Sequence, residues 1–112
     1  MGRRNHLGQF EFMTLVATMR LQDDAYGVAI AREIGTASGR DVAMASLYLT
    51  LGRLETNGLI ESKRGEPTPE RGGRAKTYFK VTAKGIREVR DARRALMTLW
   101  NGVPILTAGE TR

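Results

Sequence analysis

Residues 44–58 read MASLYLTLGRLETNG, and this stretch decides the fold. Three leucines recur in it with the spacing i, i+4 and i+7: Leu47, Leu51 and Leu54. That spacing places them on one side of a helix, so the sequence predicts a helix over Met44–Asn57 with a narrow apolar inner face. Gly58 is typical of the residue that ends a helix.

A β-hairpin is predicted directly after this helix. Leu59–Arg64 is expected to be a strand, and Lys76–Val81 alternates so that Phe79 and Val81 share one face. The stretch Gly65–Gly73 between them has two prolines and three glycines, which predicts a loop. A hairpin in this position is the wing of a winged-helix domain.

A second helix is predicted upstream, over Ala25–Ser38. Asp24 is its expected N-cap, because a carboxylate there can accept from the free amides of the first turn, and Gly39 is its expected end. Its expected buried stripe is Tyr26, Ile30, Ile34 and Ala37. Two helices joined by a short link form a helix-turn-helix pattern. The predicted fold is therefore mainly α with a small β-hairpin (α+β), a winged helix-turn-helix.

The first predicted helix, Leu7–Leu21, is apolar over most of its circumference. Phe10 and Met13 lie on one side, while Phe12 and Val16 extend the apolar surface around the cylinder. Such a helix must be covered on more than one side. In a chain this small, we expect one side to face the core and the other side to face a second subunit.

The last predicted helix begins near Thr82, a candidate N-cap, and runs to about Asn101. Apolar residues fall on its heptad a and d positions, with Arg93 interrupting them: Ile86, Val89, Leu96, Trp100 and Val103. Because little of the chain's own core is left to cover, we expect this helix to pack on a partner. The predicted division is a winged helix-turn-helix over 1–81, a C-terminal dimerisation helix over 82–103 and a flexible tail over 104–112. The expected dimer contacts are Phe10, Met13, Ile86, Val89, Leu96, Leu99, Trp100 and Val103.

Composition narrows the function classes. The chain has 112 residues, a net charge of +6 and a pI near 10.3. A surplus of Lys and Arg is typical of a protein with a polyanionic partner such as nucleic acid, and a merely basic surface is the alternative that charge alone leaves open. It has no cysteine and a single histidine, His6, so we expect no metal site, no cofactor and no catalytic nucleophile with its base. No apolar run approaches the roughly 20 residues that cross a bilayer, and residues 1–6 lack the apolar region of a secretory signal. A cytoplasmic protein is expected.

The candidate nucleic-acid contacts lie on the third helix and the wing. With the leucines turned inward, small and polar side chains face outward, which suits an approach to the floor of the major groove. Hydroxyl and cationic side chains on the flanks and in the wing are suited to phosphates. The predicted DNA-binding residues are Ala45, Ser46, Tyr48, Leu49, Arg53, Arg64, Arg71, Gly72, Gly73, Arg74 and Lys76. Gly52 lies on the same outer face, although glycine in a helix interior lowers helix stability. Either this cost is offset because the helix backbone can approach DNA closely there, or the glycine is simply tolerated at the surface.

Several segments together carry a resemblance that covers about residues 7–100. They are Leu7–Glu11, Asp24–Gly27, Ser46–Glu55, Gly58–Ile60, Gly65–Lys76, Tyr78–Phe79 and Val81–Thr82 followed by Gly85. In this combination the chain resembles the PadR family of bacterial transcriptional regulators, in its short form with a single C-terminal dimerisation helix. The resemblance implies a winged helix, a homodimer and usually repression of a neighbouring gene.

Some members of that family are released from DNA by phenolic acids or multidrug-like compounds. Trp100 and Leu96 are therefore candidates for an aromatic or drug-like effector pocket at the subunit interface, with plain dimer packing as the alternative for Trp100.

Two functions follow from the sequence. The first is a sequence-specific DNA-binding regulator, a homodimeric repressor that acts on duplex DNA in the bacterial cytoplasm. The alternative is a winged-helix protein-interaction module without DNA binding, because the outward face of the third helix carries few charges. An enzyme is not expected.

Overall fold

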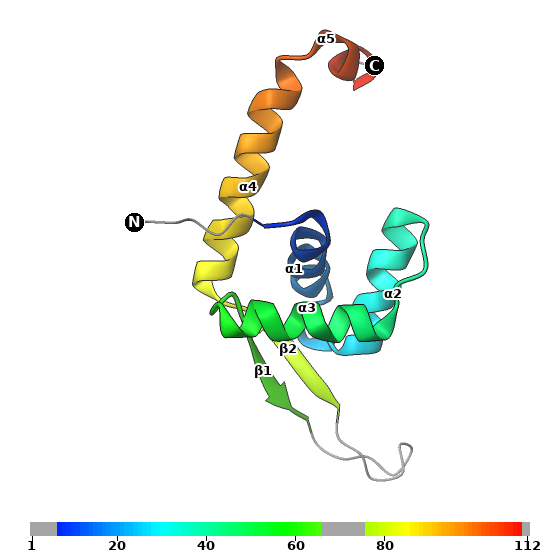
Figure 1. Ribbon diagram of the computed structural model, residues 1–112, viewed down its shortest axis with the longest axis vertical. Coiled ribbons are helices and arrows are strands. Elements are labelled where there is room, and N and C mark those ends of the chain that lie inside the picture. Colours follow the sequence, from blue (N-terminus) through cyan, green and yellow to red (C-terminus); the bar gives the residue numbers. More distant parts are fainter. Residues whose placement is uncertain (1–6, 66–75, 111–112) are drawn as a thin grey trace.

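The computed structural model describes residues 7–65 and 76–110, and Figure 1 shows their arrangement. In chain order these residues form α1 (Gln9–Leu21), a 3₁₀ helix (Gln22–Asp24), α2 (Gly27–Ser38), α3 (Met44–Thr56), β1 (Ile60–Arg64), β2 (Thr77–Val81), α4 (Ala83–Asn101), α5 (Pro104–Thr107) and a second 3₁₀ helix (Ala108–Glu110). Helices dominate, and β1 and β2 pair as one antiparallel hairpin. The predicted fold class, mainly α with a small hairpin, is confirmed.

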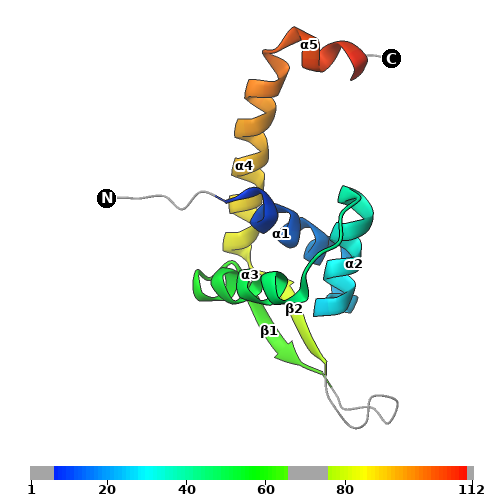
Figure 2. The ribbon, with the colours of Figure 1, turned by 45° about the vertical axis from the view of Figure 1, so that its right-hand side comes forward.

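Helix α1 lies at the centre of the domain, where α2, α3 and β2 contact it (Figures 1 and 2). Its Leu15 is fully buried, and so are Thr14 and Thr18. These two hydroxyls donate to the carbonyls of Phe10 and Thr14, so the polar atoms inside the core have partners. The core consists of Leu15, Ala17, Ala25, Ile30, Ala31, Ile34, Leu47, Leu51, Leu54, Leu59, Ile60, Phe79, Val81 and Val89.

The start of α2 differs from the sequence expectation. Asp24 is not the N-cap, because it lies in the first 3₁₀ helix, and α2 begins at Gly27 after an extended Tyr26. Ala25 is fully buried and its carbonyl accepts from the Phe79 N–H (2.8 Å). Pairing with β2 therefore holds the residues before α2 in an extended conformation, which the capping pattern alone does not show.

The rest of α2 agrees with its pattern except at the end. Ile30 and Ile34 are buried as predicted, and Tyr26 is half-buried. Ala37 was expected in the buried stripe but is exposed, because the last turn of α2 extends past the core. Gly39 ends the helix in the left-handed conformation (φ 75°), which confirms the expected stop.

A set of short contacts ties α3, the hairpin and α4 together. Gly58 follows α3 at φ 77°, and its carbonyl accepts from the Thr82 hydroxyl (2.7 Å). The same hydroxyl accepts from the Gly85 N–H (3.1 Å), so Thr82 is the N-cap of α4, as predicted. A Cβ on Gly85 would overlap the Leu59 carbonyl oxygen, and only glycine permits this close approach.

Helix α4 leaves the domain as an arm (Figures 1 and 2). Gly85 and Val89 in its first turns are buried, whereas Leu96 and Leu99 further along are exposed. The residues after Gly102 were expected to be a tail, and the structure has α5 and a 3₁₀ helix there, with Pro104 at a first-turn position that suits its fixed φ. Among the described helices, none has the length and apolarity required to cross a bilayer.

Two glycine-to-alanine variants test this packing. Gly85→Ala is expected to lower the free energy of unfolding by about 1–3 kcal/mol, because the Leu59 carbonyl is backbone and cannot move aside cheaply. Gly52→Ala is the control. A Cβ at this helical position would meet no heavy atom within 4 Å, so the variant should raise the same quantity by about 0.5–1 kcal/mol. Urea unfolding at one protein concentration measures both, and equal stability of the two variants would contradict the packing at Gly85.

Candidate DNA-binding surface

The inner and outer faces of α3 differ sharply in exposure. Leu47, Leu51 and Leu54 are at most 1% exposed, whereas Leu49 is 67% exposed and Tyr48 is 50% exposed. Ala45, Ser46 and Arg53 are also exposed. The structure therefore brings together on one solvent-facing side the five α3 residues that the sequence selected.

Gly52 lies within this outer face and contributes no side chain. A Cβ there would meet nothing within 4 Å, so no contact inside the described protein requires a glycine. Its effect is to leave the backbone of α3 open between Leu49 and Arg53. The missing side chain leaves room for a groove of DNA to come close to the helix backbone at this position.

Tyr48 is fixed by a contact that sequence reasoning missed. Its hydroxyl lies so close to Gly27, the first residue of α2, that a Cβ on Gly27 would overlap it. Half of the Tyr48 side chain stays exposed, so the ring spans from the outer face of α3 to the start of α2. Gly27 was the signal in the sequence that could have revealed this contact. Glycine disfavours helix formation, so a glycine at the first position of α2 indicates that another group occupies the space of its side chain.

Arg53 is held at the edge of the outer face. Its Nε lies 3.5 Å from Oε2 of Glu11 on α1, and its side chain is 60% exposed. The other carboxylate oxygen of Glu11 accepts from the Gly8 N–H (2.9 Å), which caps α1. An ion pair this exposed contributes little stability, so it orients Arg53 without preventing the guanidinium from turning to a phosphate.

The wing residues fall into three groups. Arg64 is exposed at the end of β1. Lys76 is half-buried, with its Nζ 3.9 Å from the ring centroid of Tyr26. The remaining predicted wing contacts, Arg71, Gly72, Gly73 and Arg74, lie outside the described residues.

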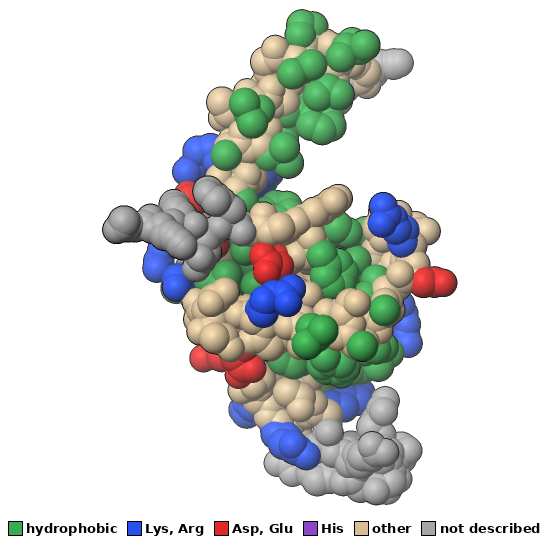
Figure 3. Space-filling view, in the orientation of Figure 1, with side chains coloured by type: hydrophobic (Ala, Val, Ile, Leu, Met, Phe, Trp, Pro, Cys, Tyr) green, Lys and Arg blue, Asp and Glu red, His purple; other side chains and the backbone are tan. Residues whose placement is uncertain are grey.

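Cations on the strands add to the charge near the wing. Lys63 on β1 and Lys80 on β2 are exposed, and Figure 3 shows Lys and Arg side chains around the hairpin. Lys80 was not among the predicted DNA contacts, although its alternation with the buried Phe79 and Val81 placed it on the outer face.

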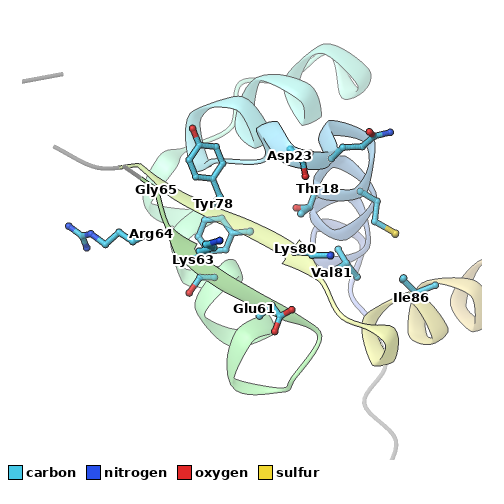
Figure 4. Close-up of a pocket in the computed structure, with 14 residues that line it drawn as sticks. Thr18, Asp23, Glu61, Lys63, Arg64, Gly65, Tyr78, Lys80, Val81 and Ile86 are labelled. Atoms are coloured by element: carbon cyan, nitrogen blue, oxygen red, sulfur yellow. The ribbon is translucent and has the colours of Figure 1, made fainter. Parts of the chain in front are cut away.

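A hollow of about 1030 Å³ lies between the end of α1 and the hairpin (Figure 4). Its lining mixes acidic Asp23 and Glu61 with basic Lys63, Arg64 and Lys80. The opposed charges distinguish it from a uniformly basic groove for nucleic acid. Trp100 and Leu96 do not line this hollow.

The residues predicted for dimerisation divide into two groups. Val89 belongs to the core of its own chain, and Phe10, Met13 and Ile86 pack partly buried against that core. On the arm, Leu96 is 52% exposed, Leu99 is 72% exposed and Val103 is 38% exposed, while Trp100 is half-buried. The predicted contacts at the end of α4 and just after it, and not those near the core, are therefore the ones whose apolar side chains a single chain leaves in solvent.

Comparison with known proteins decides the family. The model of the transcriptional regulator PadR-like family matches residues 16–91, which is more than half of the chain. The chain belongs to the PadR-like family. This confirms the resemblance on which the sequence analysis relied.

Solved structures of PadR-like and other transcriptional regulators share the fold. A PadR family transcriptional regulator from Eggerthella lenta is 26% identical with a TM-score of 0.67, and the match covers 93% of this chain and 86% of that one. A transcriptional regulator from Clostridium thermocellum is 25% identical with a TM-score of 0.66 over 80% and 81% of the two chains. A PadR-like transcriptional regulator from Bacillus cereus is 20% identical and shares the fold, with a TM-score of 0.71 over 87% and 89%. No curated protein matches the chain.

Membership of the PadR-like family makes the chain a DNA-binding transcriptional regulator, a class that is not an enzyme class. Of the two functions drawn from the sequence, the family favours DNA binding over a protein-interaction module.

Two leucines of α3 provide a matched test of its faces. Leu47→Ala is expected to lower the free energy of unfolding by about 2–5 kcal/mol, because it empties a fully buried position. Leu49→Ala should change that quantity by no more than about 0.5 kcal/mol, because the side chain is mostly in solvent, yet it should weaken DNA binding about tenfold. Urea unfolding and fluorescence anisotropy with labelled duplex measure the two effects. Unchanged DNA affinity in the Leu49 variant would remove this residue from the DNA contact.

Proposed function

We propose that this PadR-like protein is a homodimeric repressor that recognises a two-fold symmetric operator with α3 and the wing of each subunit. The observation that carries the proposal is the outer face of α3, which is exposed to solvent and has no side chain at Gly52, while the inner face is fully buried. Such a repressor acts in the bacterial cytoplasm, where the operator DNA lies.

Each proposed contact has a chemical role. Ala45, Ser46 and Leu49 lie in the first half of α3, the part of a recognition helix that usually contacts base edges, and an exposed leucine is suited to a thymine methyl group. Tyr48 and Arg53 flank that face and bind phosphates.

The wing supplies the second set of contacts. Arg64, Arg71 and Arg74 follow the backbone of the duplex or enter the minor groove beside the recognition site. Gly72 and Gly73 let the chain approach the DNA closely between two of these arginines.

Salt dependence tests this account of the contacts. Arg53, Arg64, Arg71 and Arg74 amount to eight cations in a dimer, so the logarithm of the binding constant should fall with the logarithm of salt concentration with a slope of about −7. The duplex is obtained by selection from a random library with the purified protein, and anisotropy titrations from low to high salt give the slope. A folded protein that selects no duplex even at low salt would overturn the proposed function.

Charge reversal of Arg71 and Arg74 should weaken binding to the selected duplex. It should also make the salt-dependence slope shallower, in proportion to the number of phosphate contacts that are lost. Charge reversal that leaves both the affinity and the slope unchanged would exclude the wing loop from the interface.

The arm supports the dimer. Leu96, Leu99 and Val103 on its far part are exposed, and Ile105 and Leu106 on α5 are 84% and 42% exposed. Figure 3 shows apolar side chains gathered along α4 and α5. A second copy of the arm would remove this surface from water, and burial of apolar area is the main driving force of association.

Leu99→Glu tests the dimer interface. Placing a charge at a 72% exposed apolar site of the arm should raise the dimer dissociation constant by more than about tenfold and weaken DNA binding in parallel. Thr98→Glu is the matched control, since Thr98 is an exposed neighbour among Arg90, Arg93 and Arg94 and should leave the dimer intact. Sedimentation equilibrium gives the constants. Equal dissociation in the two variants would locate the interface elsewhere.

The same arm carries the proposed effector site. Trp100 and Leu96 would form an apolar wall between the two arms for an aromatic or drug-like compound. Such a compound releases DNA only if it binds more tightly to an arrangement of the subunits that does not fit the operator. Trp100 is the only tryptophan of the sequence, so quenching of its fluorescence reports binding, and loss of duplex affinity over the same concentration range reports release.

A further inference from the structure

The segment at the start of α2 contacts both α3 and the hairpin. Ala25 and Tyr26 run antiparallel to β2: the Phe79 N–H donates to the Ala25 carbonyl, and Tyr26 forms a bridge with Tyr78. The next residue, Gly27, lies against the Tyr48 hydroxyl of α3. Two adjacent residues, Tyr26 and Gly27, therefore join the loop end of the hairpin to α3.

The Tyr26 ring contacts Tyr78 on β2 and Lys76, the residue before β2. Its centroid lies 5.7 Å from that of Tyr78, with the two planes at 70°, and Lys76 Nζ lies 3.9 Å from the Tyr26 centroid. Lys76 and Tyr78 are two residues apart along the hairpin, which places both side chains on one face. The ammonium is attracted to the negative face of the ring, while the ring-to-ring contact has the favoured edge geometry.

Both ends of the wing loop meet at this cluster. The Gly65 N–H donates to the Lys76 carbonyl (2.7 Å), which closes the hairpin ladder at the loop. A Cβ on Gly65 would overlap the Tyr78 ring, so the chain passes directly over that ring as it leaves β1. Gly65 and Lys76, the described residues on either side of the wing loop, are thus held by contacts with each other and with Tyr78, and both Lys76 and Tyr78 contact Tyr26.

We propose that Tyr26 is a positioning residue for the wing, and that Lys76 acts through the Tyr26 ring and does not serve as a phosphate ligand. Lys76 is half-buried, whereas Lys63, Arg64 and Lys80 around it are exposed. The ring contact and the burial account for the position of the Lys76 ammonium without DNA. The inference rests on the proposed role of α3 and the wing as joint DNA contacts, and it adds the element that fixes one relative to the other.

The test in DNA binding uses Tyr26 and Lys76 variants of the full chain with the selected duplex. Tyr26→Leu removes the ring and is expected to weaken binding about 3- to 10-fold, whereas Tyr26→Phe keeps the ring and should retain wild-type affinity. Lys76→Gln should weaken binding in the wild-type background but have little further effect beside Tyr26→Leu. Lys76→Arg keeps a cation on the ring, so in the wild-type background it should bind the duplex with wild-type affinity, unlike Lys76→Gln.

Salt slopes and footprints separate positioning from direct contact. Lys80→Gln removes one exposed cation from the same strand and is the charge control. A Lys76 phosphate contact would make the slope shallower by about 0.9 for each Lys76 lost, with or without the Tyr26 ring, and this result would overturn the proposal. The expected result is non-additivity of the two substitutions, with hydroxyl-radical protection lost only under the wing and kept under α3. Loss of binding in Tyr26→Phe would make the hydroxyl a direct contact and would also overturn it.

A measurement without DNA keeps this test apart from the proposed function. In the free protein, the Lys76 Cε protons should lie upfield of those of Lys80 because of the Tyr26 ring current, and Tyr26→Leu should abolish the difference. Equal shifts in the wild type would refute the ring contact even if the duplex is bound. Failure to bind any duplex, with the shift present, would count against the proposed function alone.

Discussion

The burial of three leucines constrains everything that α3 can do. Leu47, Leu51 and Leu54 are almost completely withdrawn from solvent, and removing any of them from the core would cost several kcal/mol. The helix therefore cannot rotate about its axis without exposing them. The residues between the leucines are fixed outward as a consequence, so the packing that stabilises the core also sets the orientation of the outer face of α3.

The other elements are arranged around that fixed helix. The Thr82 hydroxyl donates to the Gly58 carbonyl just after α3, so the start of α4 is positioned by the end of α3. The start of α2 touches α3 at Tyr48 and the hairpin at Tyr78. The start of α4 is thus coupled to the end of α3 by a side-chain-to-backbone hydrogen bond, and the start of α2 is coupled to α3 and the hairpin by the side chains of Tyr48 and Tyr78.

Local sequence patterns were sufficient to predict α1 to α4, the hairpin and the two faces of α3, but not the start of α2 or the helical turns after Gly102. The leucine spacing, the glycines at 39 and 58, and the alternation of Phe79 and Val81 each reflect local geometry, and each was confirmed. The start of α2 was wrong because Asp24 is a good local cap, while the competing interaction, pairing of Ala25 with β2, comes from residues more than fifty positions away. The contacts of Tyr48 with Gly27 and of Arg53 with Glu11 were missed for the same reason.

Helix α4 shows a second limit of prediction from the sequence. A heptad pattern marks apolar positions but does not say whether the covering surface belongs to the same chain. Val89 fits the pattern as well as Leu96 does, yet Val89 is buried by its own domain and Leu96 is half exposed. The boundary lies where α4 passes the edge of the core, a point set by the tertiary position of the helix. Only beyond that point do apolar side chains on α4 remain exposed to solvent, so the length of α4 past the core determines how much apolar surface the single chain leaves uncovered.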